Sequence, residues 1–505
     1  MTEDPQDQLV PADVIPPGTL PPLRYRDLPE PVSVRKMVGP SIILAGLALG
    51  SGEFVLWPYI TVQSQFIFFW ACVLGVTIQY FLNMEIARWT LATGETAVTG
   101  FCRISRIWAC VFLLLNIIPW IPPAWAKGAG QMLGWLLWGE SFDPTGNVST
   151  WISIGGLFAC GILLTAGPVV YETVERLQLL LVSFVVIMVI AIALMVVRTD
   201  AVIAQAEGMM SFGVPEITDD LDAVVLLGAI AFAGVGGTMN LGQSNYIKDK
   251  GYGMGQYIGR ITSPVTGHEE AAAGVGYHFP PSEGNSRRWR LWWSRASTEH
   301  FISFYLTCLI SLVLLTLISY SLFYDANGQT NESMPEVGKG MGFVWQEAVA
   351  LGKMEGIGPF IRVAFLLMGC AILLTTEIGV LDGVSRISGD IAKINWLRDS
   401  DRWSESKLYY LFLWGIIFVG AGILLMQMFG QDVTAFKLFK FTAAMNGGVM
   451  FIYSGLLLYM NSRMLPAEVR TPMWRRGILV ASTLFFGFFS LWAVSSVVSE
   501  MLGVK

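Results

Sequence analysis

Apolar segments separated by short polar loops make up most of the chain from residue 39 onward. Each segment is long enough to cross about 30 Å of hydrocarbon as a helix. The pattern predicts an all-α integral membrane protein with about eleven transmembrane helices, near residues 39–61, 66–89, 107–138, 150–167, 177–197, 222–247, 301–323, 357–382, 408–428, 435–460 and 474–499. The third segment is overlong and contains Pro119, Pro122 and Pro123, which predicts a kink or an extension outside the membrane.

These helices divide the chain into consecutive regions. We expect residues 1–34 to form a disordered cytoplasmic tail, because they are rich in proline and acidic residues. Residues 35–198 are expected to hold helices 1–5, residues 199–461 helices 6–10, and residues 462–505 helix 11. An insertion at about residues 249–300 carries interleaved arginine and tryptophan. It is predicted to be cytoplasmic, and either to lie on the membrane in contact with lipid or to form a solvated loop.

Composition supports the membrane assignment, since 54% of the 505 residues are hydrophobic and only 14% are charged. With the N-terminus in the cytoplasm, most of the 32 Lys and Arg residues fall on the cytoplasmic side, as the positive-inside rule requires. The positive charges follow the membrane sides rather than forming one patch, so no nucleic-acid partner is predicted. The sequence has no Gly-x-x-x-x-Gly-Lys-Ser/Thr phosphate loop, and we predict neither an enzyme nor a bound cofactor.

Glycines interrupt the first apolar segment at the point where it also carries an acid. Gly50, Ser51 and Gly52 are followed directly by Glu53. A carboxylate at membrane depth costs several kcal/mol unless it is paired, solvated or ligated. Broken helices at that depth also free backbone carbonyls that need partners. We therefore predict that this stretch is half of a binding site.

The sixth apolar segment has the same design in the matching place of the second half. Gly234, Gly236 and Gly237 interrupt it, after Ala233, and Thr238 begins a run of polar residues. Paired discontinuous helices of this kind mark the midplane substrate site of secondary transporters. Close helix packing is the alternative explanation for the glycines. The Asn446-Gly447-Gly448 stretch in span 10 predicts a further unwound, polar-lined segment.

Several short patterns resemble the Nramp family of divalent metal transporters. They are Gly39-Pro40 before the discontinuous first span, Ala87-Arg88 and then Thr93-Gly94 at the end of the second, and Glu175 at the start of the fifth. The resemblance covers spans 1 to 10. It implies a leucine-transporter-type fold with five-plus-five inverted repeats and discontinuous helices 1 and 6.

The chain departs from the family at the metal-binding motifs. Gly50-Ser51-Gly52-Glu53 stands where the family has Asp-Pro-Gly-Asn, and Gly236-Gly237-Thr238 stands where it has Met-Pro-His. The soft thioether and the histidine are therefore missing. Oxygen ligands from Glu53, Thr238 and backbone carbonyls suit hard, partly hydrated cations, and the same groups suit a small organic amine.

Three further ionisable residues are candidates for proton movement or coupling. Lys127 is the one charge within span 3, in a region where Nramp proteins tend to place acids on the proton path. It either exchanges protons or neutralises a buried carboxylate such as Glu53 or Glu377. Glu377 in span 8 is either on the cation route or caps a helix break. Glu85, three residues before Arg88, fits a local ion pair as well as a coupling role.

The function predicted from these observations is secondary active transport by alternating access, with a small, hard, partly hydrated divalent cation as substrate. The alternative is an amino-acid or polyamine permease on the same fold. A non-transporting membrane sensor is the remaining class, and the charges at membrane depth argue against it.

Overall fold

The computed structural model describes residues 8–33, 37–167, 169–218, 221–262, 276–331, 340–431 and 433–501. The first half holds α1 (Pro40–Ala48), the π-helical η3 (Gly52–Leu56), α2 (Trp57–Ser64), α3 (Phe69–Thr93), α4 (Ala97–Ile104), α5 (Ile107–Ile117), α6 (Ala124–Trp138), α7 (Asn147–Ala166) and α8 (Val170–Val196). Then follow α9 (Thr199–Ser211), α10 (Ala223–Ala231), α11 (Gly237–Lys250), α12 (Glu283–His300), the π-helical η6 (Phe301–Leu306), α13 (Thr307–Phe323), α14 (Gly342–Gly352), α15 (Gly358–Asn395), α16 (Glu405–Leu425), α17 (Ala435–Arg463) and α18 (Met473–Met501).

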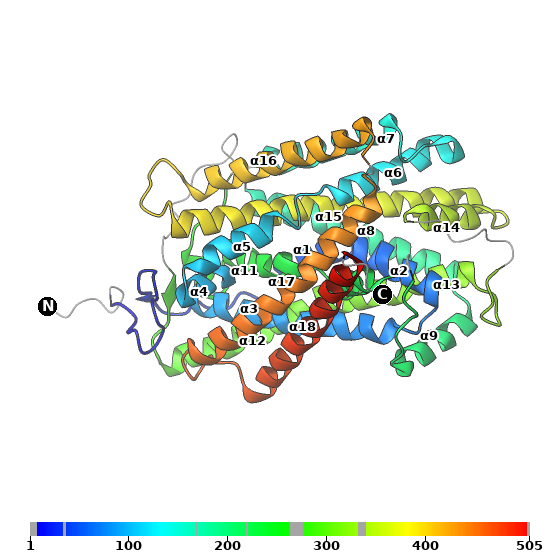
Figure 1. Ribbon diagram of the computed structural model, residues 1–505. Coiled ribbons are helices and arrows are strands. Elements are labelled where there is room, and N and C mark those ends of the chain that lie inside the picture. Colours follow the sequence, from blue (N-terminus) through cyan, green and yellow to red (C-terminus); the bar gives the residue numbers. More distant parts are fainter. Residues whose placement is uncertain are drawn as a thin grey trace.

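The long helices form a bundle in which most of them run along one common direction (Figure 1). The N-terminus and α4 lie at one end of the bundle, and α9 and α14 lie at the other (Figure 1). We call the first the tail end, because residues 8–33 pack there. The two strands, β1 (Arg24–Tyr25) and β2 (Tyr277–His278), form one short parallel pair. The expectation of an all-helical membrane protein is met apart from this pair.

Nine helices among the described residues are long and apolar enough to cross a membrane. The sequence predicts eleven, and the difference lies in two predicted spans that are divided into shorter helices. The third span consists of α5 and α6, which the proline-rich segment at 118–123 separates, as its composition predicts. The sixth consists of α10 and α11, separated at 232–236.

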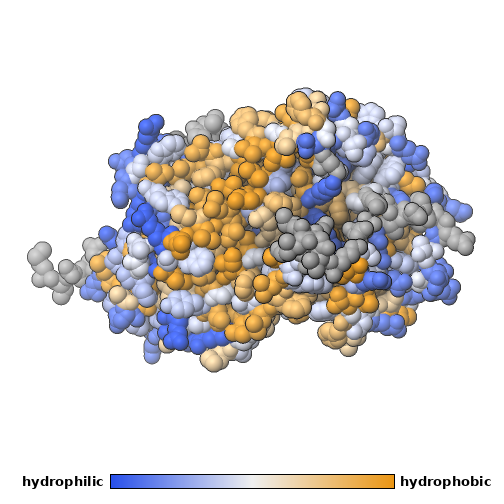
Figure 2. Space-filling model, viewed as in Figure 1, coloured by the Kyte–Doolittle hydropathy of each residue, from blue (hydrophilic) through white to orange (hydrophobic). Residues whose placement is uncertain are grey.

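An apolar surface surrounds the middle of the bundle. Figure 2 shows a broad hydrophobic band across the centre of the viewed face, with hydrophilic residues concentrated at its two ends. In α8, Leu180, Ile187 and Leu194 are spaced by seven residues and are 67%, 65% and 84% exposed. That spacing puts them on one face of the helix. Exposed leucine and isoleucine side chains in such a row suit contact with lipid hydrocarbon.

Residues 8–33 of the N-terminal tail have a defined structure, which differs from the disorder predicted for residues 1–34, and residues 1–7 and 34 lie outside the described residues. Its apolar side chains Val10, Ile15, Leu20, Leu23 and Leu28 are buried. Backbone groups of the tail accept hydrogen bonds from arginine and tryptophan side chains of α4 and α12, namely Arg103, Trp292 and Arg295. The acidic, proline-rich composition suggests disorder, but these distant partners supply the buried surface that the tail lacks on its own.

The tryptophan-rich part of the predicted insertion is a helix and not a solvated loop, and residues 263–275 of the insertion lie outside the described residues. Residues 283–300 form α12, which continues through η6 into α13 as one 41-residue helical element. Trp289 and Trp292 are buried, and Trp293 packs under the guanidinium groups of Arg88 and Arg475. The tryptophans and arginines of the insertion therefore hold the tail and helices together at the tail end.

His278 provides a pH test of the tail packing. It lies in β2, outside the candidate spans, is 3% exposed, and hydrogen-bonds through Nδ1 to the Ala92 carbonyl. Burial lowers the pKa of His278 to about 4, below the value of about 6.5 in an unfolded chain. The neutral ring therefore contributes stability above about pH 6.5, and we expect about 3 kcal/mol to be lost as the pH falls toward about 4.

Thermal unfolding in detergent and proteolysis of the tail, both followed against pH, check this prediction. His278→Gln keeps a donor for the Ala92 carbonyl but does not titrate, so its acid sensitivity should be smaller than that of the natural protein. Equal acid sensitivity of the two proteins would contradict the assignment to His278.

Candidate substrate site at the paired helix breaks

The break in the first span is narrower than the sequence predicts. Leu49 and Gly50 form a turn after α1, and the chain then re-enters a helix at once, with π-type hydrogen bonding from Gly52 to Leu56. Glu53 therefore lies in a π-helical turn instead of a non-helical segment. Thr376 of α15 approaches the carbonyls of Gly46 and Leu47 at 3.3 and 3.5 Å. This hydroxyl serves backbone groups at the end of α1 where the regular ladder stops.

The break in the sixth span is fully unwound, as predicted. Residues 232–236 carry no regular helix, and Gly234, Gly236 and Gly237 have φ of 132°, 80° and 54°. Side chains with a Cβ rarely adopt such values, so glycine is required here. Ala233 and Gly236 lie in the unwound stretch, whereas Gly237 and Thr238 begin α11.

The two breaks touch each other inside the bundle. A Cβ on Gly52 would lie 1.8 Å from the carbonyl oxygen of Phe232, so only glycine allows this approach. A cavity of about 10 Å³ lies between the breaks. This volume admits roughly one water molecule. Its lining comes from both breaks and from the start of α6, and includes Leu47, Ala48, Ser51, Gly52, Trp120, Trp125, Phe232, Gly234 and Val235.

Gln79 of α3 holds the unwound segment in place. Its Nε2 donates to the carbonyls of Ala231 and Ala233 at 2.9 and 3.2 Å. Its Oε1 accepts from the Gly236 amide at 3.1 Å. One buried side chain thus replaces three backbone hydrogen bonds that the helix would have supplied. The sequence signal for it is a lone glutamine in the apolar second span, which our sequence reasoning did not use.

Aromatic rings form one wall of the cavity. Trp120 stacks on Trp125 and on Phe232, with ring centroids 5.5 and 5.8 Å apart. The Trp120 indole donates to Thr238 Oγ1 at 2.9 Å. The Ser51 hydroxyl and the Trp125 indole nitrogen are buried without a hydrogen-bond partner among the described residues. Both polar atoms belong to residues that line the cavity and remain available to a bound group.

Glu53 is fully buried but does not line this cavity. Its carboxyl lies beside the thiol of Cys308 on α13 and near that of Cys72 on α3. Both of its oxygens are buried, and neither has a hydrogen-bond partner in the described part of the chain. The predicted pair of metal ligands, Glu53 and Thr238, is thus divided, with Thr238 bonded to Trp120 and Glu53 directed toward α13.

Lys127 and Glu377 occupy different surroundings and do not neutralise Glu53. Lys127 Nζ lies 3.1 Å from Ser149 Oγ and 2.6 Å from Gln427 Oε1. The predicted ion pair with Glu53 or Glu377 is absent from the salt bridges of the described residues, because Lys127 faces α7. Glu377 instead accepts the Ala126 amide at 3.0 Å and so caps the start of α6.

Glu85 lies in a saturated polar network at the tail end. It accepts hydrogen bonds from Arg88, Arg475, Asn461 and Thr471, at distances from 2.5 to 3.2 Å. A carboxylate with this many donors is held in its ionised form and joins α3 to α17 and α18. The structure therefore favours the local ion pair over a coupling role.

Asn446 does not mark an unwound segment, which corrects the prediction for span 10. α17 is continuous from Ala435 to Arg463. The glycines of this stretch serve packing, since a Cβ on Gly447 would lie 2.6 Å from Leu227. Asn446 nevertheless belongs beside the site: its Oδ1 lies against Gly237 at the start of α11 and has no hydrogen-bond partner among described residues.

No group of three or more His, Cys, Asp or Glu side chains is arranged to hold a metal ion within the described ranges. Ligands at the breaks would have to include hydroxyl and backbone oxygens, as the sequence predicts for a hard cation. Such oxygens equally suit hydrogen bonds to an amine.

The architecture defines a multi-pass integral membrane protein with two broken spans that meet inside the bundle. Solved structures of the manganese transporter of Eremococcus coleocola share this fold. Two mutants of that transporter match this chain with TM-scores of 0.67 and 0.66. Each is 12% identical to this chain in sequence, and each match covers 98% of this chain and 92% of the transporter chain. The same transporter in complex with an aromatic bis-isothiourea compound matches with a TM-score of 0.63.

The resemblance to Nramp transporters is thereby confirmed at the level of the fold, which implies the leucine-transporter-type arrangement. No family model and no curated protein sequence matches the chain.

Gln79→Leu tests how the unwound segment is held. It keeps the volume of the side chain but leaves two carbonyls and one amide of the break without partners. Since each buried unsatisfied group costs about 1–3 kcal/mol, we expect a loss of stability of about 3 kcal/mol or more. Thermal unfolding in detergent measures it. Thr77→Val, on the same helix, removes a hydroxyl bonded mainly within α3 and should cost far less. Similar losses in both variants would show that Gln79 has no special role.

Proposed function

We propose that the protein is a secondary transporter that moves a small cation by alternating access, with the substrate bound between the paired breaks. The contact of Gly52 with the Phe232 carbonyl carries this proposal, because it brings two interrupted spans together inside the bundle. The substrate-binding residues we propose are those of the two breaks, Gly50 to Glu53 and Ala233 to Thr238, together with Asn446. The likeness to manganese transporters over 98% of the chain supports this function.

The orientation we propose places the N-terminus and the tail end in the cytoplasm. At the tail end, α12 carries four arginines, and α4 and the segment before α18 add one each, namely Arg287, Arg288, Arg290, Arg295, Arg103 and Arg470. The opposite end carries acidic segments, including Asp200, Glu207, Glu216 and Asp222. This distribution follows the positive-inside rule. An acidic outer surface also raises the local concentration of cations.

A hard, partly hydrated divalent metal ion is the first candidate substrate. The soft ligands of the family motifs are replaced by residues that offer hydroxyl and carbonyl oxygen, and Glu53 directly follows Gly52, which lines the cavity. Binding would require Glu53 to rotate from the thiol of Cys308 toward the breaks, or to supply its charge from a distance.

An organic amine is the second candidate, and the aromatic wall favours it. Trp120, Trp125 and Phe232 present π-systems to the cavity, and a positively charged ammonium group interacts favourably with aromatic faces. The Ser51 hydroxyl would accept a hydrogen bond from it. The two candidates share the requirement for a negative charge at Glu53.

Glu53→Gln tests the role of that charge. The substitution keeps the shape and hydrogen-bonding capacity but removes the charge, so uptake of the cation into proteoliposomes should fall by at least about tenfold, about 1.4 kcal/mol. Glu347→Gln is a matched control, because Glu347 is also buried but lies on α14, outside both broken spans. Uptake by the Glu53→Gln protein at the natural rate would remove Glu53 from the site.

Selectivity among cations distinguishes the candidate substrates. A site with oxygen ligands alone should not prefer manganese strongly over magnesium, because it lacks a soft ligand. Competition in the uptake assay by Mn²⁺, Mg²⁺ and small organic amines measures this preference. A preference for manganese of about 100-fold, or about 2.7 kcal/mol, is incompatible with the hard-ligand site. Competition by amines alone supports the permease.

A further inference from the structure

A buried group of charged side chains ties the tail end of α11 to α15 and α16. Two basic and four acidic residues belong to this group, which we call the α11 charge cluster: Lys248, Asp249, Asp382, Arg386, Asp390 and Glu405. Five of these side chains are at most 3% exposed, and Glu405 is 12% exposed. The cluster lies at the opposite end of α11 from the break, and none of its members lines the cavity there.

Each basic side chain lies between two carboxylates. Lys248 Nζ is 3.0 Å from Asp390 Oδ1 and 2.8 Å from Glu405 Oε1. The Arg386 guanidinium donates to both oxygens of Asp382, at 2.8 and 3.2 Å, and also to Asp249 Oδ2. The cluster is thus two acid–base–acid groups that are joined through the adjacent residues Lys248 and Asp249.

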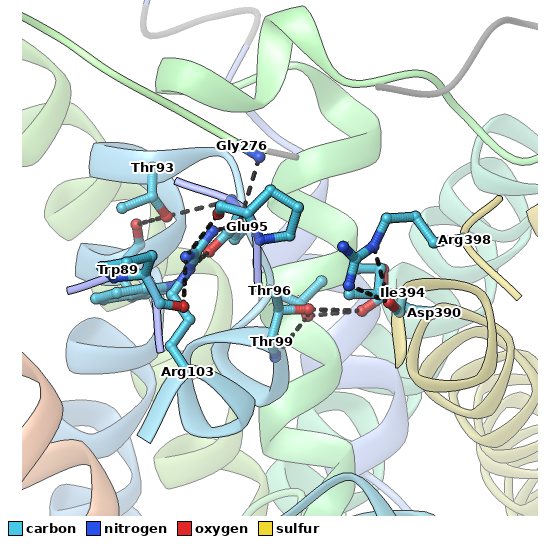
Figure 3. Close-up of polar contacts among 12 residues, drawn as sticks. Trp89, Thr93, Glu95, Thr96, Thr99, Arg103, Gly276, Asp390, Ile394 and Arg398 are labelled. Carbon is cyan, nitrogen blue, oxygen red and sulfur yellow. Dashed lines mark hydrogen bonds and ion pairs between the residues drawn. The ribbon is translucent and has the colours of Figure 1, made fainter. Parts of the chain in front are cut away.

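The charges do not balance if every acid is ionised. Four carboxylates against two cations leave two negative charges in a buried place, and uncompensated buried charge is strongly unfavourable. Among the described residues, no further cation forms a salt bridge with these acids, and Arg398, which lies beside Asp390, donates to the Ile394 carbonyl instead (Figure 3). The titratable groups that they add are Tyr246 of α11, Tyr409 of α16, Tyr171 of α8 and Cys102 of α4, while Lys250 is paired with Glu175.

Hydrogen bonds separate the four acids into two kinds. Asp382 accepts from Arg386 twice and from the Tyr409 hydroxyl at 2.9 Å. Asp390 accepts from Lys248 at 3.0 Å. It also accepts from the hydroxyls of Thr96 and Thr99, at 2.7 and 3.4 Å (Figure 3). These two carboxylates therefore have several hydrogen-bond donors each, which a neutral replacement would leave with fewer acceptors.

Asp249 and Glu405 have fewer donors. Among the described residues, the side chain of Asp249 accepts a hydrogen bond from Arg386 alone, and that of Glu405 from Lys248 alone. Asp249 Oδ1 is buried without a hydrogen-bond partner among the described residues. The hydroxyl of Tyr246, which lies near Asp382, is also buried without one. A proton on Asp249 and one on Glu405 would remove the two excess negative charges. Protonation there would disturb fewer hydrogen bonds than protonation of Asp382 or Asp390.

We propose that the α11 charge cluster is a proton-binding site, in which the carboxyls of Asp249 and Glu405 are protonated while α11 is packed against α15 and α16. When α11 separates from these helices and water enters, each O–H bond breaks, the proton passes to water and a carboxylate remains. Because α11 begins at the break, protonation here holds one side of the substrate site closed.

Neutral replacements provide the test, because Asn and Gln imitate the protonated acids. Asp249→Asn and Glu405→Gln should fold with at least the natural thermal stability, and each should remove intensity from the infrared carbonyl band of protonated carboxyls. The folded natural protein keeps two protons that the unfolded chain releases above about pH 4, so these two acids should contribute a fall in stability as the pH rises, opposite in sign to the contribution of His278. The double variant should reduce this slope. Other buried carboxyls contribute an unchanged background to every variant.

Two control variants replace acids that are well supplied with hydrogen-bond donors. Asp382→Asn removes a carboxylate with three donors. Glu95→Gln removes the partner of a balanced buried pair, in which Arg103 donates to Glu95 at 2.6 and 2.7 Å (Figure 3). Both should lower thermal stability and leave the carbonyl band of protonated carboxyls at its natural intensity.

Two results would overturn the proposal: an unchanged carbonyl band in both Asp249→Asn and Glu405→Gln, or destabilisation of these variants to the same extent as Asp382→Asn. All of these measurements use the full-length protein in detergent without substrate. Their outcome therefore does not depend on whether the transported solute is a metal ion or an amine, or on whether transport is observed.

Discussion

Inside an apolar bundle, a backbone amide or carbonyl that lacks its helical hydrogen bond must bond to another group. Several buried polar side chains of this structure supply such bonds. Gln79 serves three backbone groups of the second break, and Thr376 approaches two carbonyls of the first. Glu377 takes an amide at the start of α6 after the proline kink. These side chains come from α3 and α15. The breaks therefore exist only because neighbouring helices complete them.

The same reasoning applies to charge. Glu95 with Arg103, and Glu85 with Arg88 and Arg475, are buried acids whose basic partners at least match them in number. The α11 charge cluster has twice as many acids as bases. This difference separates charges that stabilise the assembly of helices from charges that respond to the proton concentration. A helix that begins at an unwound break and is held at its other end by such a cluster is suited to motion between two positions.

Predictions from the sequence were most reliable where a residue type alone limits the backbone. The glycines of the sixth span require positive φ, and their place in the chain predicted both the unwound segment and its meeting with the first break. Predictions were least reliable for the partners of polar side chains. Lys127 bonds to Ser149 and Gln427 instead of an acid, and Asn446 stands on a continuous helix. Which residues meet across the bundle depends on helix rotation, and residue spacing along one span does not specify it.

The sequence by itself determined that the chain is a helical membrane protein with two glycine-interrupted spans, because hydrophobic length and glycine placement act locally. Residue identity also fixed which side chains stand at the breaks, with Glu53 after Gly52 in the first span and Thr238 after Gly237 in the sixth. The tertiary structure alone decided that Glu53 faces Cys308 rather than the cavity, that three aromatic rings line the cavity, and that the tail is ordered. Those outcomes rest on contacts between residues far apart in the chain, whose free energy appears only when the helices pack together.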